Sequence, residues 1–496
     1  SSSSSSSGSS SGGGSGSGTL VDSGTSGADA GAGYDASWGT PVDGGPPYSG
    51  PSVPGTVTVA RATTAGRLGP GFAGFSYEKS HMTDGFFTAS NAPLIAMYKL
   101  LGPGGVMRIG ANDVDKTTWV ASAMPVAGGT ISPNVGTADV DGLASFLSAT
   151  GWKSLYGLNF KTSTPTVAAA EAQYVSKQLG GNLAAFEIGN EPNFYAGGCG
   201  AFQATWEQFT AAIVAAVPNA PMSGPGAFSA ASSASTGCAT AFATAEASRI
   251  VLLTQHYYIA GAGGGSTTAD ILTPRPVVVT ESKSLSSAVV ANHVRDGFRW
   301  AEMNSYAHHG APGVSDALAS ALWGIDFMLT TAQNGSSGVN FHGGGNGMDG
   351  TVPFTYEPIQ EMASRVVAAK PLFYGMLFVS RAGVGNMVAA TATAGALNFS
   401  AFAILLPDGS TNVALVNKDA NSGVTAAVDV GAPVAAASAM YLQGPSLGAT
   451  TGITFAGAGI SAAGAWNPSP PYALATKGAV VTVLVPPASA ALVHAN

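Results

Sequence analysis

Charged residues are scarce in this 496-residue chain, and their scarcity excludes several kinds of protein. They make up 9% of the sequence, with 19 Lys and Arg against 27 Asp and Glu. Without a basic run, the chain is not expected to bind nucleic acid. No apolar stretch approaches the ~20 residues that a transmembrane helix needs, so no transmembrane segment is expected.

Cysteine is also scarce, because only Cys199 and Cys238 are present. Their spacing is not that of a zinc site, and they form either one disulfide or two unpaired thiols. The histidines that invite a metal interpretation lack the i, i+4 pairing of a catalytic zinc site; they are His256, His308, His309 and His342. No metal and no cofactor are therefore expected.

Apolar residues and turn formers are abundant. Hydrophobic residues make up 45% of the chain, which is enough for a large core. The 68 Gly and 29 Pro favour many turns and short strands over a helical bundle.

Serine and glycine dominate the N-terminal part. Residues 1–18 are almost entirely Ser and Gly, and the polar character continues through residues 1–48. Such a segment buries too little apolar surface to order itself, so a flexible tether is expected. A tether of this kind suits attachment at a cell surface, and the expected location is secreted, periplasmic or cell-surface anchored.

Residues 67–372 alternate between short apolar runs and amphipathic stretches such as 166–179, 204–217 and 315–330. Eight strands are expected, at 72–76, 106–110, 153–158, 183–189, 221–225, 251–257, 299–302 and 338–341. Strand and helix repeated eight times over this length are typical of a (β/α)8 TIM barrel. A doubly wound fold is disfavoured because no glycine-rich phosphate turn follows the first strand.

After residue 372 the helical pattern stops. Short apolar runs separated by turns predict an antiparallel β-sandwich domain over 373–496. The early strand within 49–66 has no helix after it, so we expect it to join the sandwich. The fold class is thus α/β, a barrel followed by a sandwich.

The strongest chemical signal is the run Phe186-Glu187-Ile188-Gly189-Asn190-Glu191-Pro192. It puts Glu191 at the C-terminal end of a strand, where barrel enzymes keep their catalytic groups. A carboxyl group beside apolar strands has its pKa raised by desolvation, as a general acid requires.

A general acid of this kind can work with a second carboxylate that acts as nucleophile, and two residues compete for this role. Glu281 follows Val277-Val278-Val279, which imitates a strand end. Glu302 follows the candidate strand at 299–302. The segment before 277 leaves little room for a crossover helix, whereas residues 285–294 have the spacing of one helical face. Glu302 is therefore favoured, with Glu281 as the alternative.

The Asn190-Glu191-Pro192 motif resembles the acid/base motif of retaining glycoside hydrolases with a (β/α)8 barrel. More narrowly, the chain resembles glycoside hydrolase family 79, the heparanase and β-glucuronidase family, from about residue 72 to the C-terminus. The segments that carry the resemblance are 74–78, Gln255-His256-Tyr257-Tyr258, 302–305, 310–316 and 343–345.

This resemblance implies roles for three more residues. Asn190 would bind the sugar 2-hydroxyl, Glu78 would bind sugar hydroxyls, and Tyr257 would hydrogen-bond the nucleophile. Barrel placement alone adds Asn159, after the third strand, as a further substrate-binding candidate.

The sequence departs from the family where the uronate carboxylate should bind. In place of a Tyr-x-Gly motif it has Ala307-His308-His309, with the tyrosine displaced to Tyr306, so Tyr306 and His309 are the expected sugar contacts. Three lysines follow the first three strands and could pair with a uronate; they are Lys79, Lys116 and Lys161. Asp349 would repel one if it faced the mouth.

The expected function is a retaining, β-glucuronidase-like β-glycoside hydrolase that uses Glu191 as acid/base and Glu302 as nucleophile on a carbohydrate or glycoconjugate. A hydrolase of a neutral glucoside or xyloside is the alternative. A non-catalytic carbohydrate-binding barrel is a third, disfavoured because both carboxylates are present.

Overall fold

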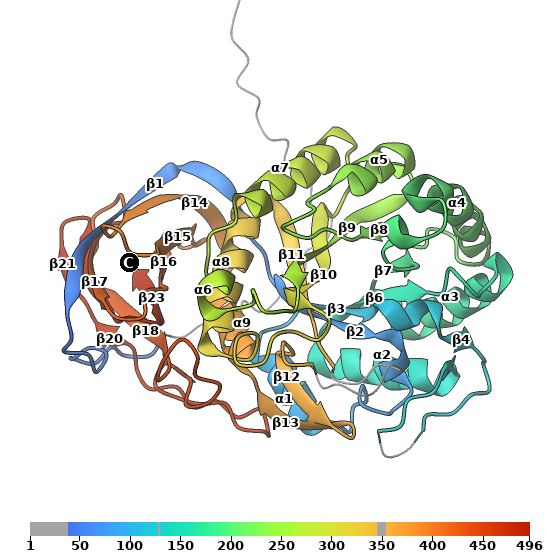
Figure 1. Cartoon of the computed structure of the whole chain (residues 1–496), viewed down its shortest axis with the longest axis horizontal. Helices are drawn as coiled ribbons and strands as arrows, with labels where there is room; N and C mark the ends of the chain where they lie inside the picture. The colour runs from blue at the N-terminus through green and yellow to red at the C-terminus, as the bar shows by residue number, and fades with distance from the viewer. Residues whose placement is uncertain (1–37, 127–128, 345–353) are drawn as a thin grey trace, which may run out of the picture. The chain divides into compact units, whose positions relative to one another are not determined.

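The computed structural model describes residues 38–126, 129–344 and 354–496, and its larger part is a closed barrel of eight parallel strands (Figure 1). The strands, in chain order, are β2 (Ala73–Glu78), β3 (Val106–Gly110), β6 (Lys153–Leu158), β7 (Leu183–Ile188), β8 (Met222–Ala227), β9 (Ile250–Gly261), β10 (Phe298–Ala307) and β11 (Ser336–His342). Each overlaps an expected strand. The predicted (β/α)8 barrel is confirmed.

Helices connect the barrel strands. They are α1 (Ala92–Leu100), α2 (Thr137–Thr150), α3 (Pro165–Leu179), α4 (Gly198–Ala216), α5 (Gly237–Glu246), α6 (Thr268–Ile271), α7 (Pro276–Ala291), α8 (Leu318–Gln333) and α9 (Pro371–Arg381). Local sequence sets their starts: in α3, Thr164 accepts a hydrogen bond from Val167 N and Pro165 takes the first helical position. Residues 276–280, which imitate a strand, form the start of α7, because Pro276 suits a helix N-terminus.

The second domain is a curled sheet of eleven strands, as expected for the sandwich. They are β1 (Ser52–Leu68), β14 (Gly385–Thr393), β15 (Phe399–Leu405), β16 (Thr411–Asn417), β17 (Gly423–Asp429), β18 (Ala437–Gln443), β19 (Thr454–Phe455), β20 (Tyr472–Ala473), β21 (Ala475–Lys477), β22 (Val480–Val485) and β23 (Ser489–Ala495). β1 pairs antiparallel with β14 and parallel with β17, and Figure 1 shows this blue strand beside orange β14. Two short ladders stand outside both sheets: β4 (Thr118–Trp119) with β5 (Asn134–Val135), and β12 (Ile359–Met362) with β13 (Arg365–Ala369).

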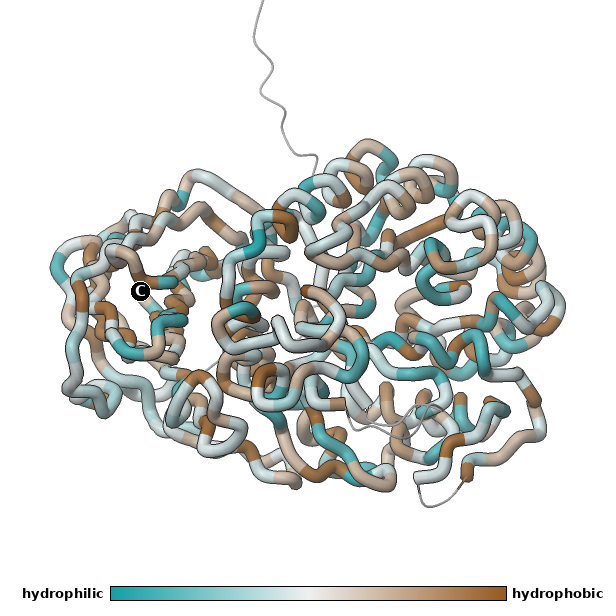
Figure 2. Tube along the Cα trace, in the orientation of Figure 1, coloured by the Kyte–Doolittle hydropathy of each residue, from teal (hydrophilic) through white to brown (hydrophobic). Residues whose placement is uncertain are grey.

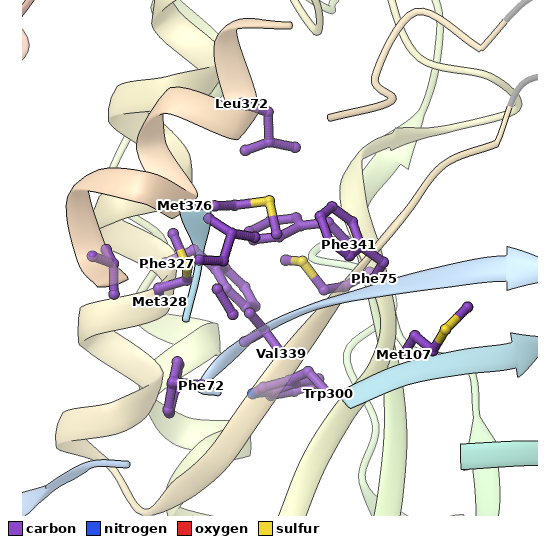
Figure 3. Packing of buried hydrophobic residues seen from close by; sticks show 14 of the residues in the cluster. Phe72, Phe75, Met107, Trp300, Phe327, Met328, Val339, Phe341, Leu372 and Met376 are labelled. Atoms are coloured by element: carbon purple, nitrogen blue, oxygen red, sulfur yellow. The ribbon is translucent and has the colours of Figure 1, made fainter. Parts of the chain in front are cut away.

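The helical pattern does not end at residue 372, which corrects the sequence interpretation. Residue 372 lies inside α9, where every residue from Pro371 to Val379 is buried. A short, nearly continuous apolar run fits a buried helix as well as a buried strand, so the sequence pattern did not separate α9 from the strands that follow. Figure 3 shows Leu372 and Met376 close to Phe327 and Met328 of α8 and to Phe75 and Phe341 of the barrel strands.

The end of the barrel near the N-termini of its strands is filled by the buried side chain of Arg299. Its guanidinium donates to Asn340 Oδ1 and to the carbonyls of Phe72 and Val339. Gly338 is required here, because a Cβ at that position would lie 1.9 Å from Arg299 Nη1. The chemistry must therefore occur at the opposite end.

Hydrophobic and hydrophilic residues alternate over short stretches of the chain (Figure 2). Among the helices that the structure describes, none combines the length and hydropathy needed to cross a bilayer.

Cys199 and Cys238 form a disulfide, which decides between the two alternatives that the sequence leaves open. It joins the first turns of α4 and α5. These helices follow β7 and β8, the strands that carry part of the site described next. Residues 1–37, most of the expected tether, lie outside the described residues.

Candidate active site

The sharp turn after β7 sets the position of Glu191. Gly189 has φ 75° and Glu191 has φ 53°, and Glu191 N donates to Gly226 O at 3.0 Å. A left-handed conformation at a non-glycine residue costs about 1 kcal/mol or more and is found at sites where geometry matters for function. The turn leaves the Glu191 side chain 15% exposed at the C-terminal end of the barrel strands.

Glu302 lies within β10 and faces the same space. An oxygen of Glu191, an oxygen of Glu302 and a ring nitrogen of His256 all lie within 4.8 Å of one another. Retaining glycosidases hold their carboxyl groups about 5–5.5 Å apart, whereas inverting enzymes need roughly 6.5–9.5 Å to admit a water. The observed spacing fits the retaining arrangement.

Arg108, fully buried on β3, donates hydrogen bonds to three side chains of the site. Its Nη1 donates to Glu302 Oε2 at 2.8 Å, its Nη2 to Asn190 Oδ1 at 2.9 Å, and its Nε to Glu187 Oε2 at 2.5 Å. One guanidinium thus fixes the nucleophile candidate, the asparagine before the acid/base candidate and a second buried carboxylate. Removing it would leave charged groups buried without a partner.

The two candidate catalytic carboxyls have opposite electrostatic environments. Burial raises the pKa of Glu191, and the hydrogen bond from His256 only partly offsets this. Burial also acts to raise the pKa of Glu302, but His342, His256 and Arg108, with the Tyr258 hydrogen bond, outweigh it and lower the pKa to about 2. The surroundings thus shift the two pKa values in opposite directions, which is the difference that an acid and a nucleophile require.

His256 lies between these carboxyls, with Nδ1 3.1 Å from Glu191 Oε1. By distance alone, Glu191, His256 and Glu302 could hold a metal ion. The donor set does not fit a resident cation well, because the fully buried Arg108 already contacts Glu302 and would repel it.

Glu78 and Asn190 lie at the same end of the barrel, as the family resemblance implies. Glu78 is buried at the end of β2, accepts a hydrogen bond from Asp113 N at 2.6 Å and lies 3.7 Å from His342 Nε2. Burial and the nearby Asp113 raise its pKa well above the ordinary value. Asn190 Nδ2 donates to Asn112 Oδ1 at 3.3 Å.

The tyrosine that contacts Glu302 is Tyr258 and not Tyr257, so the prediction for Tyr257 was wrong by one residue. Tyr258 OH donates to Glu302 Oε1 at 2.9 Å. Side chains alternate along a strand, so Tyr258 shares the inner face of β9 with His256. Tyr257 faces outward, where its ring packs against Trp300 and Phe327 of α8.

Asn159 and Tyr306 are engaged elsewhere, which corrects two substrate-binding predictions. Asn159 Nδ2 donates to Thr117 O and to Thr162 Oγ1, so it links the loop after β3 to the loop after β6. Tyr306 OH donates to Asp270 Oδ2 at 2.6 Å, toward α6. Glu281, the alternative nucleophile, lies on α7 and accepts a hydrogen bond from Ser229.

His309 stays a candidate sugar contact, in a left-handed turn with its ring stacked 4.6 Å from Phe354. Each of the three lysines has other contacts: Lys79 donates to the buried Glu171, and Lys161 lies over the Tyr195 ring. Lys116, 3.1 Å from Asp113 and 41% exposed, is near Glu78. Asp349 lies outside the described residues.

Sequence reasoning missed Arg108, although a signal was present. A charged residue at the centre of the apolar run 106–110 is almost never buried without a partner, so it pointed to a buried carboxylate. The roles of Tyr258 and His342 at the site were missed too, because the inner face of a strand cannot be identified from the run alone.

Tyr258→Phe is expected to lower kcat/KM by about 10- to 100-fold at pH values on the acid limb of the profile, on any substrate that the wild type cleaves. Losing a hydrogen bond to a charged group, worth about 1.5–3 kcal/mol, raises the pKa of Glu302 by roughly one to two units. Since Glu302 must be ionised, the acid limb of the kcat/KM–pH profile moves to higher pH. Tyr257→Phe is the matched control, since the Tyr257 hydroxyl has no hydrogen-bond partner among the described residues. Equal profiles for the two variants would contradict this role.

Comparison with solved structures finds glycosidases with a similar fold. A 4-O-α-L-rhamnosyl-β-D-glucuronidase from Fusarium oxysporum has a similar structure, with TM-score 0.71 and 19% identity over 90% of this chain and all of that one. An α-L-arabinofuranosidase from Thermotoga maritima has TM-score 0.64 and 12% identity over 89% of this chain and 99% of that one. The fold of this chain is therefore similar to the folds of these two glycosidases.

In sequence, the chain is similar to β-glucuronidases. One from Aspergillus niger is 25% identical over 293 residues, which cover 52% of this chain and 54% of the relative. One from Neurospora crassa is 29% identical over 147 residues, 27% of this chain and 24% of the relative. The chain thus matches about half or less of the length of these relatives. No protein-family model matches it.

Proposed function

We propose that the protein is a retaining β-glycoside hydrolase that acts on β-glucuronides. The observation that carries the proposal is the pair Glu191 and Glu302, which have carboxylate oxygens within 4.8 Å of each other and pKa values shifted in opposite directions by their surroundings. The buried Arg108 and Tyr258, which contact both oxygens of Glu302, support its role as the ionised member.

In the proposed first step, a Glu302 oxygen attacks the anomeric carbon while Glu191 gives its proton to the leaving oxygen. The bond to the leaving group breaks and a glycosyl ester forms on Glu302. In the second step, Glu191, now ionised, takes a proton from water, which attacks the anomeric carbon and releases Glu302. His256 beside Glu191 stabilises the ionised form between the steps, because its hydrogen bond lowers the pKa that burial raises.

A glucuronide is proposed as the substrate because two similar sequences and a similar structure are named as glucuronidases. Lys116, close to Glu78, supplies positive charge near the expected sugar-binding groups. His309 is proposed as a further contact of the sugar.

A neutral glucoside or xyloside is the second candidate, and a specific observation favours it. Ala307 and His309 stand where the family motif has its tyrosine and glycine, and Tyr306 is committed to Asp270. The buried Lys79 is paired with Glu171 and so cannot serve a uronate.

A screen of aryl β-glucuronide, β-glucoside and β-xyloside tests the proposal. We expect kcat/KM for the glucuronide to exceed that for the glucoside at least tenfold. Comparable kcat/KM values for the two substrates, or a preference for the glucoside, would favour the neutral sugar as the substrate. Inactivity on all three would contradict the hydrolase proposal.

We also propose that the protein is exported and that its Ser/Gly-rich N-terminal segment acts as a tether, with cell-surface attachment as the use that such a segment suits. The composition of residues 1–48 supports the tether. The Cys199–Cys238 disulfide supports an oxidising compartment.

A further inference from the structure

Two phenylalanine rings form an aromatic pair beside the acid/base candidate. Phe194 is 65% exposed, Phe228 is half-buried, and their ring centroids are 5.3 Å apart. Phe194 ends the short turn that Glu191 begins, and Phe228 directly follows β8. Both rings therefore lie at the barrel end that holds the two carboxylates.

Hydrogen bonds through Asn193 hold the pair in place before any ligand binds. Phe228 N donates to Asn193 Oδ1 at 2.9 Å, and Asn193 Nδ2 donates to Phe228 O at 3.5 Å. Phe194 N donates to Glu191 O at 2.9 Å. These backbone hydrogen bonds occupy the Asn193 amide. A ligand on the pair would therefore contact only the ring carbons of Phe194 and Phe228.

The pair is connected to both catalytic candidates. Phe228 stacks on Tyr258 at 6.2 Å and 21°, and Tyr258 donates to Glu302. Four neighbouring barrel strands, β7, β8, β9 and β10, form the arc between Glu191, which follows β7, and Glu302 on β10. Phe194 follows β7 and Phe228 follows β8, so both lie on this arc. Glu78, which is expected to bind sugar hydroxyls, is on β2, and His342 beside it is on β11, both on the other arc.

We infer that Phe194 and Phe228 form the platform that binds the leaving group, and that this platform favours a planar aromatic leaving group such as a phenol. The inference rests on the proposed hydrolase function. Glu191 must reach the leaving oxygen, so a group attached to that oxygen extends past Glu191 onto the rings that adjoin it. Flat aromatic faces stack on such rings, whereas an anionic sugar chain finds no charged or hydrogen-bonding partner on them.

The test measures kcat/KM of Phe194→Ala on three glucuronosyl substrates that differ only in the leaving group: a methylumbelliferyl glucuronide, a methyl glucuronide and glucuronosyl fluoride. We expect about a tenfold loss on the aryl substrate and less than a twofold change on the other two, whose leaving groups are too small to stack. Phe194→Trp should retain the aryl activity. Val290→Ala, at an equally exposed position on α7, is the control for a general surface effect.

The outcomes separate the inference from the function. Equal losses of Phe194→Ala on all three substrates, or no loss on the aryl one, would overturn the inference while hydrolysis itself stands. A glucuronosyl disaccharide serves as a fourth substrate. A loss confined to this disaccharide would show that the platform stacks a sugar, and would also overturn the inference. A wild type that cleaves none of the substrates, fluoride included, would overturn both the function and the inference.

Discussion

Glu302→Ala is expected to lose at least about 10⁴-fold in kcat and to regain activity in azide. Without the nucleophile no glycosyl ester forms, and residues that act as a unit in catalysis show losses of this size. The deleted side chain leaves space below the anomeric carbon. Azide enters it and attacks that carbon as the leaving group departs, giving a glycosyl azide of inverted configuration. Product analysis by NMR measures this.

Glu281→Gln is the matched control for that experiment, because Glu281 is a buried glutamate of the same barrel but lies on α7. Its Oε1 accepts a hydrogen bond from Ser229, which a glutamine oxygen can still accept. We expect near wild-type kcat and no effect of azide. An unimpaired Glu302→Ala, or a loss of kcat in Glu281→Gln as large as that in Glu302→Ala, would overturn the assignment.

Glu191→Gln is expected to lower kcat/KM by about 10³-fold on alkyl glycosides but less than about tenfold on substrates with good leaving groups. General acid catalysis contributes roughly 10²–10⁴-fold, and a leaving group of low pKa does not need the proton. Because kcat/KM reports the first step, the slower second step of the variant does not obscure the comparison.

The pH profile gives a second measurement on the same variant. Burial raises the pKa of Glu191, and the first step needs its protonated form, so wild-type kcat/KM falls as pH rises through that raised pKa. The variant has no proton to lose there, so its alkaline limb should disappear for good leaving groups. Equal losses on both substrate types, or an unchanged alkaline limb, would remove Glu191 from the acid role.

The barrel could be predicted because each of its strands is a short apolar run followed by turn-forming residues. The choice of Glu302 over Glu281 followed from chain length, since only residues 285–294 could supply a helix before the seventh strand. Helix α9 was not predicted, because its short, nearly continuous apolar run fits a buried helix as well as a buried strand.

The site was predictable only in part, because sequence gives the order of side chains on a strand but not which face is inside. Tyr257 and Tyr258 are adjacent, and one residue decides which reaches Glu302. Asn159 directly follows β6 and Tyr306 lies near the end of β10, yet both have nearby partners: Thr117 and Thr162 for the first, Asp270 for the second. Such contacts depend on loop conformation, which the motifs do not encode.

Trapping of the covalent intermediate tests the central claim, a retaining double displacement at Glu302, most directly. A 2-deoxy-2-fluoro-glucuronosyl fluoride forms the glycosyl ester but slows its hydrolysis, so the labelled protein can be digested and sequenced by mass spectrometry. We predict one sugar per chain, attached to Glu302 in the peptide that spans β10, and no label in Glu302→Ala. A label on Glu281 or another residue, or turnover to an inverted product without a label, would contradict it.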